Sequence, residues 1–425
     1  MRRNTSISLL AVGHACVDIY QGAVAALIPF FVAERDYTYA VASGIVLAAS
    51  LLSSVAQPVF GALTDRWAMP WLLPVSTLLG GVGIALSGLS GSYGLTLLFV
   101  AVSGVGVAAY HPESARLARL ASAGSHSAMS WFSLGGNIGF ALAPLMVAAA
   151  IGHGSLRWTP VLVLPALAGA ALCLPVLRML DRPRTGTAGT RAPRSADDMA
   201  SFVRLSLAVV FRSVVFTGLS TFVSLHAQQR MEGSATAGTV ALFLLFLGGA
   251  FGSVLGGSLA NRYDRVRVSR WSYLLSVAAV TGVIHAPGPA MFLFVALTSA
   301  GLYVPFSLQV TLGQDYLPSR VGTAAGVTLG LTVSVGGLVS PLLGHLADTT
   351  DLRTALTPLI AMPALSWLLF RTLPEPTPPG ALRRTAPSAT TSGTWKEAGR
   401  DSTPVPGTPP GRPGGPRRAP GRTRP

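Results

Sequence analysis

The first candidate site is a group of polar side chains inside an apolar stretch near the start of the chain, residues 7–33. His14, Asp18, Tyr20 and Gln21 interrupt this stretch. A charge near the middle of a membrane-spanning helix costs about 2.5–3.5 kcal/mol on insertion scales, so Asp18 must face protein or water. His14 and Asp18 are four residues apart and share a helix face, which Gln21 continues. We expect Asp18 to bind and release a proton.

A second polar group lies in the apolar stretch 95–118. Glu113 and Arg116 are three residues apart and can pair on one helix face. Glu113 is therefore either a second proton-carrying group, tuned by Arg116, or half of an ion pair at the end of a helix. Imidazole titrates near neutral pH, so His111 and His14 are candidate proton relays. The alternative for both is a hydrogen-bonded histidine with a structural role.

Arg212 is a cationic residue well inside a third apolar stretch, 202–227. Its guanidinium stays charged, and the planar fork suits a phosphonate, phosphate or carboxylate on a substrate. Alternatively, Arg212 is a permanent countercharge for Asp18. The two roles combine if a proton on Asp18 frees Arg212 for an anionic substrate. The other candidate substrate-binding side chains are polar groups in apolar stretches: Tyr20, Gln21, Tyr303 and Gln309.

Composition indicates where these residues must sit. The chain has 425 residues, of which 50% are hydrophobic and 11% charged. A soluble chain carries about 25% charged residues, so most of this surface does not meet water. The net charge of +15 comes from arginines in loops and the C-terminal region, so we do not expect a nucleic-acid partner. Cys16 and Cys173 form no disulfide framework or zinc motif.

The elements that position the polar residues are apolar segments long enough to span a bilayer. We expect twelve, at about 7–33, 40–63, 70–90, 95–118, 126–151, 156–180, 202–227, 235–260, 268–286, 289–313, 320–347 and 353–373. A signal peptide does not explain the first, because it is too long and many similar segments follow. The predicted organisation is two six-helix halves, a central loop between them and a disordered basic tail, in the order 1–180, 181–201, 202–373 and 374–425.

Arginine placement predicts the orientation of this all-α membrane protein. Arginines are frequent at both ends of the chain, in the central loop and in every second break between segments. Because cytoplasmic loops carry the excess of Arg and Lys, we expect both termini and the central loop to be cytoplasmic. The multi-pass protein would then reside in the plasma (inner) membrane.

An internal repeat supports the division into halves. At an offset of about 197 residues, the stretch Gly61–Arg66 corresponds to Gly257–Arg262, and Gly104 corresponds to Gly301. A glycine-rich run ending at Pro144 likewise corresponds to one ending at Pro341. Parallel six-helix repeats are typical of one large class of transporters, in which the substrate site lies between the halves.

The segments, the repeat and the Gly61–Arg66 stretch resemble the major facilitator superfamily from residue 7 to about 373. The His14–Asp18–Tyr20 pattern, together with the stretch His111–Arg116, resembles the fosmidomycin-resistance-type exporters of that superfamily. The resemblance implies a cavity lined by the first helix of each triplet. It also implies two halves that rock for alternating access, with export of a drug or metabolite driven by the proton gradient.

The predicted gate lies at the cytoplasmic end of the second segment. Asp65 and Arg66 end this segment near the start of the eleventh, where a helix N-terminus stabilises a carboxylate. The repeat partner Asn261 keeps hydrogen-bonding capacity without the charge. The basic residues that normally follow this signature are absent, because the chain continues with Trp67. Arg116 completes the predicted gating set.

Together with the buried polar residues, the resemblance implies a proton-coupled exporter of a small, fosmidomycin-like and anionic toxic compound. The alternative is a proton-coupled uptake permease for a sugar or another small metabolite. We do not expect an enzyme or a metal site, because the histidines and acids lack HExxH-type spacing. The paired glycines lie in apolar segments and indicate helix packing rather than a phosphate loop. We expect a monomer with no cofactor beyond the proton gradient.

Overall fold

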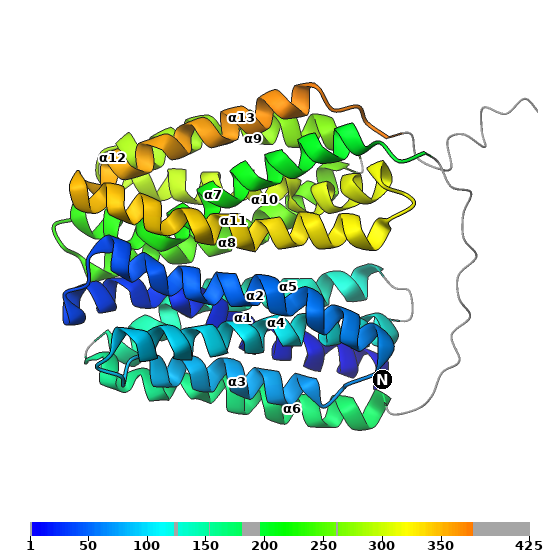
Figure 1. Cartoon of the computed structure of the whole chain (residues 1–425), viewed down its shortest axis with the longest axis horizontal. Coiled ribbons are helices and arrows are strands. Elements are labelled where there is room, and N and C mark those ends of the chain that lie inside the picture. Colours follow the sequence, from blue (N-terminus) through cyan, green and yellow to red (C-terminus); the bar gives the residue numbers. More distant parts are fainter. Residues whose placement is uncertain (1, 123–125, 153, 181–195, 261, 377–425) are drawn as a thin grey trace, which may run out of the picture. The chain divides into compact units, whose positions relative to one another are not determined.

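The computed structural model describes residues 2–122, 126–152, 154–180, 196–260 and 262–376, which form helices and no strands (Figure 1). The helices of the N-terminal half are α1 (Arg2–Arg35), α2 (Tyr39–Arg66), α3 (Leu72–Ser87), α4 (Tyr93–Ser122), α5 (His126–Ile151), η1 (Leu156–Val163) and α6 (Leu164–Leu180). Those of the C-terminal half are α7 (Met199–Arg230), α8 (Ala235–Ala260), α9 (Arg265–His285), α10 (Ala290–Tyr316), α11 (Val321–Thr349), α12 (Leu352–Leu356), η2 (Thr357–Ile360) and α13 (Ala361–Arg371).

In the described part of the chain, these helices run from one end of the bundle to the other twelve times, as predicted. The short helix η1 leads directly into α6, and α12, η2 and α13 follow one another as a single pass. Within the described residues, nine helices are long and apolar enough to cross a membrane, and α3 is a shorter apolar helix. Helices are required here because lipid offers no hydrogen bonds to the backbone.

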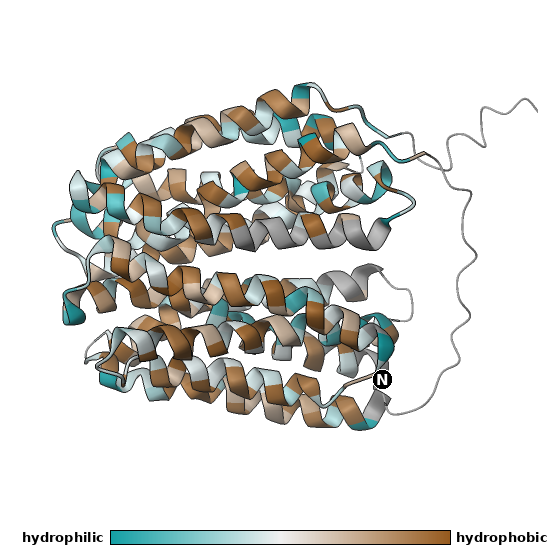
Figure 2. Cartoon of the chain, viewed as in Figure 1, coloured by the Kyte–Doolittle hydropathy of each residue, from teal (hydrophilic) through white to brown (hydrophobic). Residues whose placement is uncertain are grey.

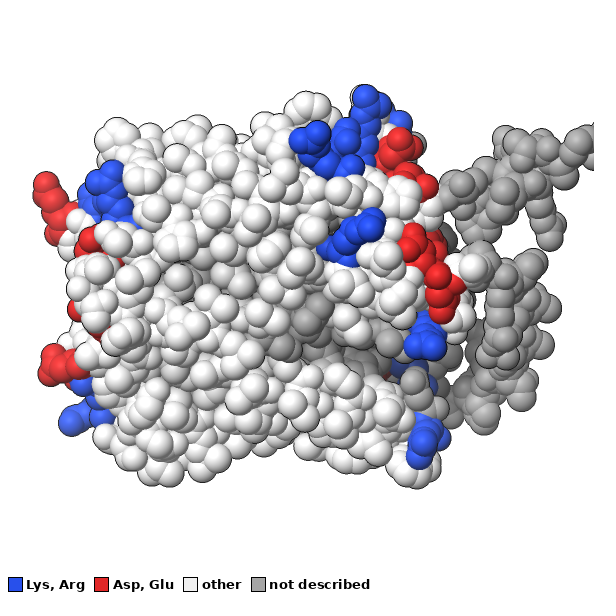
Figure 3. Space-filling model, turned by 45° about the horizontal axis from the view of Figure 1, so that its top comes forward, with Lys and Arg blue, Asp and Glu red and all other residues white. Residues whose placement is uncertain are grey.

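Charge and hydropathy divide the bundle into two polar ends and an apolar middle. Apolar residues run along the helices, whereas hydrophilic residues gather at the two ends (Figure 2). On the face seen in Figure 3, the Arg, Asp and Glu side chains also lie at the two ends and leave the middle clear. This band is where we place the lipid.

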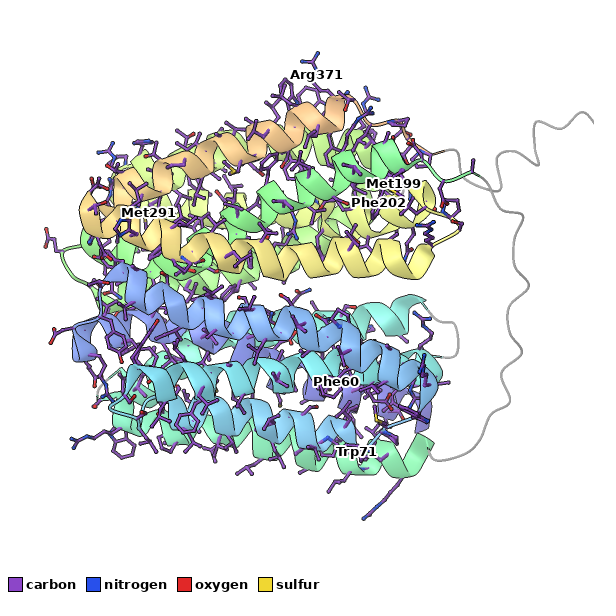
Figure 4. The ribbon with its side chains drawn as sticks, viewed as in Figure 1. Phe60, Trp71, Met199, Phe202, Met291 and Arg371 are labelled. Atoms are coloured by element: carbon purple, nitrogen blue, oxygen red, sulfur yellow. The ribbon has the colours of Figure 1, made fainter. Side chains whose placement is uncertain are left out.

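We name the two ends of the bundle by the chain segments found there. Figure 4 shows Met199 and Phe202, at the start of α7, at one end, and Met291, at the start of α10, at the other. We call the first the loop end, because α6 also ends there, and the second the far end (Figure 1). Arg371 extends outward from α13 (Figure 4).

The two halves repeat the same packing. In the N-terminal half α1 packs on α5 and α2 on α4, and in the C-terminal half α7 packs on α11 and α8 on α10. The halves meet through α2 with α11 and α5 with α8. The pairs are related by the repeat seen in the sequence, so the observed fold is the predicted one of two pseudo-symmetric halves.

Two of the expected boundaries shift. Helix α7 begins at Met199, inside the predicted loop 181–201, because the Asp198 carboxylate accepts a hydrogen bond from the Ser201 amide at 3.0 Å. At the other boundary, the Arg265 Nε donates to Glu375 at 2.8 Å, so the first residues of the predicted tail lie against α9. Residues 181–195 and 377–425, which include most of the predicted loop and tail, lie outside the described residues.

Candidate functional site

A cavity of about 520 Å³ lies between the two halves. Side chains from α1, α2, α4, α5, α7, α8 and α10 line it. Seven phenylalanine and tyrosine rings form much of its wall: Tyr20, Phe132, Phe140, Phe216, Phe246, Tyr303 and Phe306. Three amides add polar groups: Gln21, Gln57 and Asn137. A cavity with this lining suits a compact molecule with both apolar and polar parts.

Three of the four predicted proton carriers meet at the wall of this cavity. His14 Nε2 lies 3.2 Å from Asp18 Oδ2, and His111 Nε2 lies 3.1 Å from Asp18 Oδ1. We call these three residues the His–Asp–His trio. Asp18 is 5% exposed and His14 is 8% exposed, whereas His111 lines the cavity. Of the three, His111 is therefore the member that a substrate or water in the cavity can reach.

The hydrogen bonds of the two histidines fix which ring nitrogen faces Asp18. His14 Nδ1 lies 2.9 Å from the Phe132 carbonyl, and His111 Nδ1 lies 2.7 Å from the Val107 carbonyl. A carbonyl only accepts, so both Nδ1 atoms carry hydrogen. In a neutral imidazole the other nitrogen is then a bare acceptor. With no additional proton, two acceptors would face an acceptor carboxylate.

The trio needs space that a glycine provides. A Cβ at Gly136 on α5 would lie 2.7 Å from Cε1 of His14 and closer still to the Asp18 carboxylate. On the other side, the Phe132 ring stacks on His14 with centroids 4.4 Å apart. The glycine-rich run, which the sequence singled out only as a packing element, thus makes room for the two polar side chains of α1.

Glu113, the fourth predicted proton carrier, belongs to a separate ion pair. Arg116 Nε donates to Glu113 Oε2 at 2.8 Å, and Arg116 Nη2 also contacts Oε1 of the same carboxylate. Glu113 is fully buried and does not line the cavity. Of the two roles considered for Glu113, the geometry favours the ion pair with Arg116.

The alternative in which Arg212 is a countercharge paired with Asp18 does not match the geometry. Asp18 pairs with the two histidines, whereas the Arg212 guanidinium lies 5.7 Å from the ring centroid of Tyr303 and 5.0 Å from that of Phe306. Arg212 is fully buried and is not among the residues that line the cavity. The two rings that it contacts both line the cavity.

The remaining predicted substrate residues divide into two groups. Gln21 and Tyr303 line the cavity. Tyr20 borders it, but its hydroxyl donates to the Leu162 carbonyl at 3.0 Å. Gln309 is 1% exposed and donates through Nε2 to the Tyr273 hydroxyl at 2.6 Å, so it does not face the cavity as expected. The prediction placed Gln309 on the cavity side of α10 incorrectly, because the sequence does not give the rotation of α10 about its own axis relative to its neighbours.

The far end of the bundle holds contacts between the halves that the sequence did not reveal. The Asp348 carboxylate, at the end of α11, accepts from the amides of Tyr39 at 2.7 Å and Ala40 at 2.9 Å, at the start of α2. Gln229 of α7 also donates to the Tyr39 hydroxyl at 2.9 Å. We call these contacts the far-end latch. Among the described side chains, these are the polar contacts that join the two halves.

The predicted gate would lie at the opposite end of the same α2–α11 pair. Arg66 is exposed at the loop end of α2. Asn261 lies outside the described residues, as does the side chain of Asp65. The predicted gate therefore stays a prediction, whereas the same physical device, a carboxylate on a helix N-terminus, occurs at the far end.

The trio also offers a set of ligands to a metal ion. One ligand atom from each of its three residues lies within 4.8 Å of the others. Two imidazoles and one carboxylate are a donor set that transition metals accept. Protons and metal ions can compete for such atoms, so measuring the metal content of the purified protein is a useful control.

Comparison with known proteins relates this architecture to one family. The family model of the Major Facilitator Superfamily matches residues 10–341. The fosmidomycin resistance protein of Escherichia coli (strain K12) is 30% identical over 372 residues, covering 84% of this chain and 91% of that protein. The uncharacterized MFS-type transporter YfnC of Bacillus subtilis (strain 168) is 28% identical over 380 residues, covering 85% and 91%.

The fold also matches solved structures. A bacterial homologue of the human lysosomal transporter Spinster, in an inward-facing and unoccupied conformation, superimposes with a TM-score of 0.70. The match covers 88% of this chain and 98% of that chain at 16% sequence identity. At this level of identity, the likeness concerns the fold.

Proposed function

Because the chain belongs to the major facilitator superfamily, we propose that it is a proton-driven exporter whose coupling site is the His–Asp–His trio. The protein is a multi-pass membrane transporter and not an enzyme. The observation that carries the proposal is the arrangement of two histidine Nε2 atoms on one carboxylate, at 3.2 and 3.1 Å, beside the cavity. Glu113 has no coupling role in this proposal.

Hydrogen bonding supports proton binding at the trio. One added proton allows one histidine to bond to Asp18, and a second proton allows both to do so. The three groups are in contact, so a bound proton belongs to the trio rather than to one residue. Since His14 and Asp18 lie on α1 and His111 lies on α4, the protonation state sets how strongly these two helices are held together.

His111 supplies the link between proton and substrate. It lines the cavity, so an anionic group on the substrate can approach its protonated ring. Asp18 and the substrate would then compete for the same imidazolium, which replaces the predicted competition for Arg212. The Arg212 charge beneath Tyr303 and Phe306 would add a constant attraction for an anion. The proposed substrate is compact, partly apolar and anionic, as a fosmidomycin-like phosphonate is.

The direction and setting of transport complete the proposal. The resemblance to the E. coli fosmidomycin resistance protein supports export. The arginine bias supports a cytoplasmic loop end and cytoplasmic termini in the inner membrane. The proposed transporter acts as a monomer. The far-end latch closes the opposite side, which suits a conformation open to the loop end.

The test uses everted membrane vesicles that have been acidified inside by respiration. Addition of fosmidomycin to vesicles containing the wild-type protein should release protons, seen as recovery of a quenched pH-sensitive dye. Asp18→Asn should abolish this recovery while the protein remains in the membrane. His111→Gln should do the same, because it removes the only member of the trio that lines the cavity.

Asp36→Asn is the matched control. It makes the same chemical change between α1 and α2, where Asp36 has φ 52°, a conformation that asparagine tolerates. It should respond as the wild type does. Normal coupled export by Asp18→Asn would contradict the assignment of the trio. If no compound in a panel of phosphonates, carboxylates and neutral drugs moves protons, the export assignment fails. Proton-coupled sugar entry would instead favour the uptake alternative.

A further inference from the structure

A second hollow lies on the C-terminal half and shares no residue with the central cavity. It is a groove of about 700 Å³ formed by α8, α9 and α10. Its rim carries exposed apolar side chains, with Leu275 69% exposed and Leu297 49% exposed. Small residues, including Ala300 and Gly301, lie between the larger ones and leave the groove open. We call it the α8–α10 groove.

One face of α9 gives this groove a graded polarity. Arg267, Trp271 and Leu275 line it and follow one another at intervals of four residues, so they form a single row along the helix. At ~1.5 Å per residue, the row runs about 12 Å from the loop end toward the middle of the bundle. A cation, an indole and an aliphatic side chain in this order match the headgroup, interface and hydrocarbon layers of a membrane.

Arg267 is available to a ligand at the mouth of the groove. Its neighbour Arg265 is already held by Asp315, with Nη1 2.6 Å from Oδ2, and by Glu375. Arg267 is exposed and has no ion-pair partner among the described side chains. Tyr263, 55% exposed, stands beside it at the same mouth and brings a phenol that can donate a hydrogen bond.

The repeat offers an internal comparison. In the N-terminal half α3 occupies the place that α9 occupies in the C-terminal half, and α3 contains no charged residue. The row of cation, indole and aliphatic side chain is therefore a property of one half and not a requirement of the fold. Its charge complements an anion, and the groove beyond it complements a hydrocarbon chain.

We propose that the α8–α10 groove binds one anionic phospholipid from the leaflet at the loop end. The lipid phosphate contacts Arg267 and Tyr263, and one acyl chain lies along Trp271 and Leu275 toward Leu297. Basic pockets between membrane helices bind anionic headgroups in this manner. The site is independent of the proton-coupling proposal, because none of its residues belongs to the trio or the cavity.

The experiment measures bound lipid on the full-length protein by native mass spectrometry from nanodiscs that contain equal amounts of phosphatidylglycerol and phosphatidylcholine. The wild type should retain one phosphatidylglycerol in preference to phosphatidylcholine. Arg267→Gln should lower this preference about fivefold, the effect of one basic residue at a membrane surface. Arg119→Gln makes the same change on an exposed arginine in the last turn of α4, also at the loop end, and should have no effect.

A second variant tests the groove itself. Ala278 is exposed and lines the groove, so Ala278→Phe should fill it without disturbing the core. This variant should lose bound lipid of both kinds. Equal retention of the two lipids by the wild type, or unchanged occupancy in both Arg267→Gln and Ala278→Phe, would overturn the proposal. Displacement of the lipid by fosmidomycin at a ratio of one to one would also overturn it, because the groove would then bind substrate.

Discussion

The two halves of the bundle are alike in fold but place different chemistry beside the cavity. The N-terminal half contributes His14, Asp18 and His111, whose charges change with protonation. The C-terminal half contributes Arg212, whose charge is permanent, beneath Tyr303 and Phe306. Both sets use repeat-related helices, α1 and α4 in one half and α7 and α10 in the other. The comparison suggests that the two halves have different functions: the N-terminal half binds the proton, and the C-terminal half attracts the charge of the substrate.

The largest expected effect comes from removing the space for the trio. In Gly136→Ala the new methyl group would overlap the Asp18 carboxylate and the His14 ring. We expect loss of proton-coupled transport and a destabilisation of about 1–3 kcal/mol, typical of overpacking. Dye-recovery assays and thermal unfolding of the purified protein measure the two effects.

The control for this variant is Gly61→Ala. Gly61 is also helical, but a Cβ at this position would meet nothing within 4 Å. Its stability should stay within about 0.5 kcal/mol of the wild type. If Gly136→Ala transported normally with the wild-type pH dependence, the trio would not be the proton site.

The next effect tests whether the C-terminal half senses charge without carrying protons. Arg212→Lys keeps the charge but loses the planar contact with the two rings. A buried cation–π contact is worth about 2 kcal/mol, so we expect KM for an anionic substrate to rise by up to about thirtyfold. The pH midpoint of transport should not move. Both quantities come from transport rates measured as a function of substrate concentration and pH.

Tyr303→Phe is the comparison for Arg212→Lys. It retains the ring that Arg212 contacts, and its KM should change by less than about threefold, since phenylalanine also supports cation–π contacts. A displaced pH midpoint in Arg212→Lys would contradict the proposed separation of functions between the halves, because a group in the C-terminal half would then influence proton binding.

A smaller effect concerns how the halves are held together at the far end. Asp348→Asn removes the negative charge from the N-terminus of α2, an interaction worth about 1 kcal/mol. The far-end latch should then open about fivefold more often. Labelling of Ser43→Cys with a maleimide, in a chain lacking Cys16 and Cys173, should accelerate accordingly, because Ser43 is buried beside this contact.

Asp351→Asn provides a matched control for the latch. Asp351 lies close to Asp348 in the sequence, but its carboxylate accepts from the Thr354 amide at 3.0 Å within the C-terminal half. The labelling rate of Ser43→Cys should therefore remain unchanged. Equal acceleration by both substitutions would indicate a general loss of stability rather than opening of the latch.

The smallest effect distinguishes the first helices of the two halves. The Asp198 carboxylate caps α7, whereas the first turn of α1 contains no acidic residue. Hydrogen bonds from Ser201 lower the pKa of Asp198. Its contribution to stability is therefore complete above the unfolded value, about 3.9, and is lost as the pH falls through the folded pKa.

Asp198→Ala should lower the free energy of unfolding by about 0.5–1 kcal/mol at neutral pH, and the difference should shrink below about pH 4. Asp198→Asn retains the cap and should resemble the wild type at neutral pH. Thermal unfolding of the three proteins from pH 3 to 7 measures this. A difference between Asp198→Ala and the wild type that persists unchanged at pH 3 would contradict the capping role.

The sequence by itself determined the membrane helices and the relations within each helix. Long apolar runs must be helical in lipid because each backbone group needs a partner in its own segment. Because residues three or four apart share a helix face, their spacing correctly placed His14 beside Asp18 and Arg116 beside Glu113. The repeat supplied the two halves, and the paired glycines indicated close helix packing without naming the partner helices.

Only the tertiary structure decided which helix faces meet. Periodicity fixes the residues that share a face, but the rotation of each helix against its neighbours depends on the fit of side chains. That fit brought His111 to Asp18, covered Arg212 with two rings and turned Gln309 toward Tyr273. It also brought Asp348 onto the start of α2. These contacts join separate helices, so no spacing within one helix could predict them.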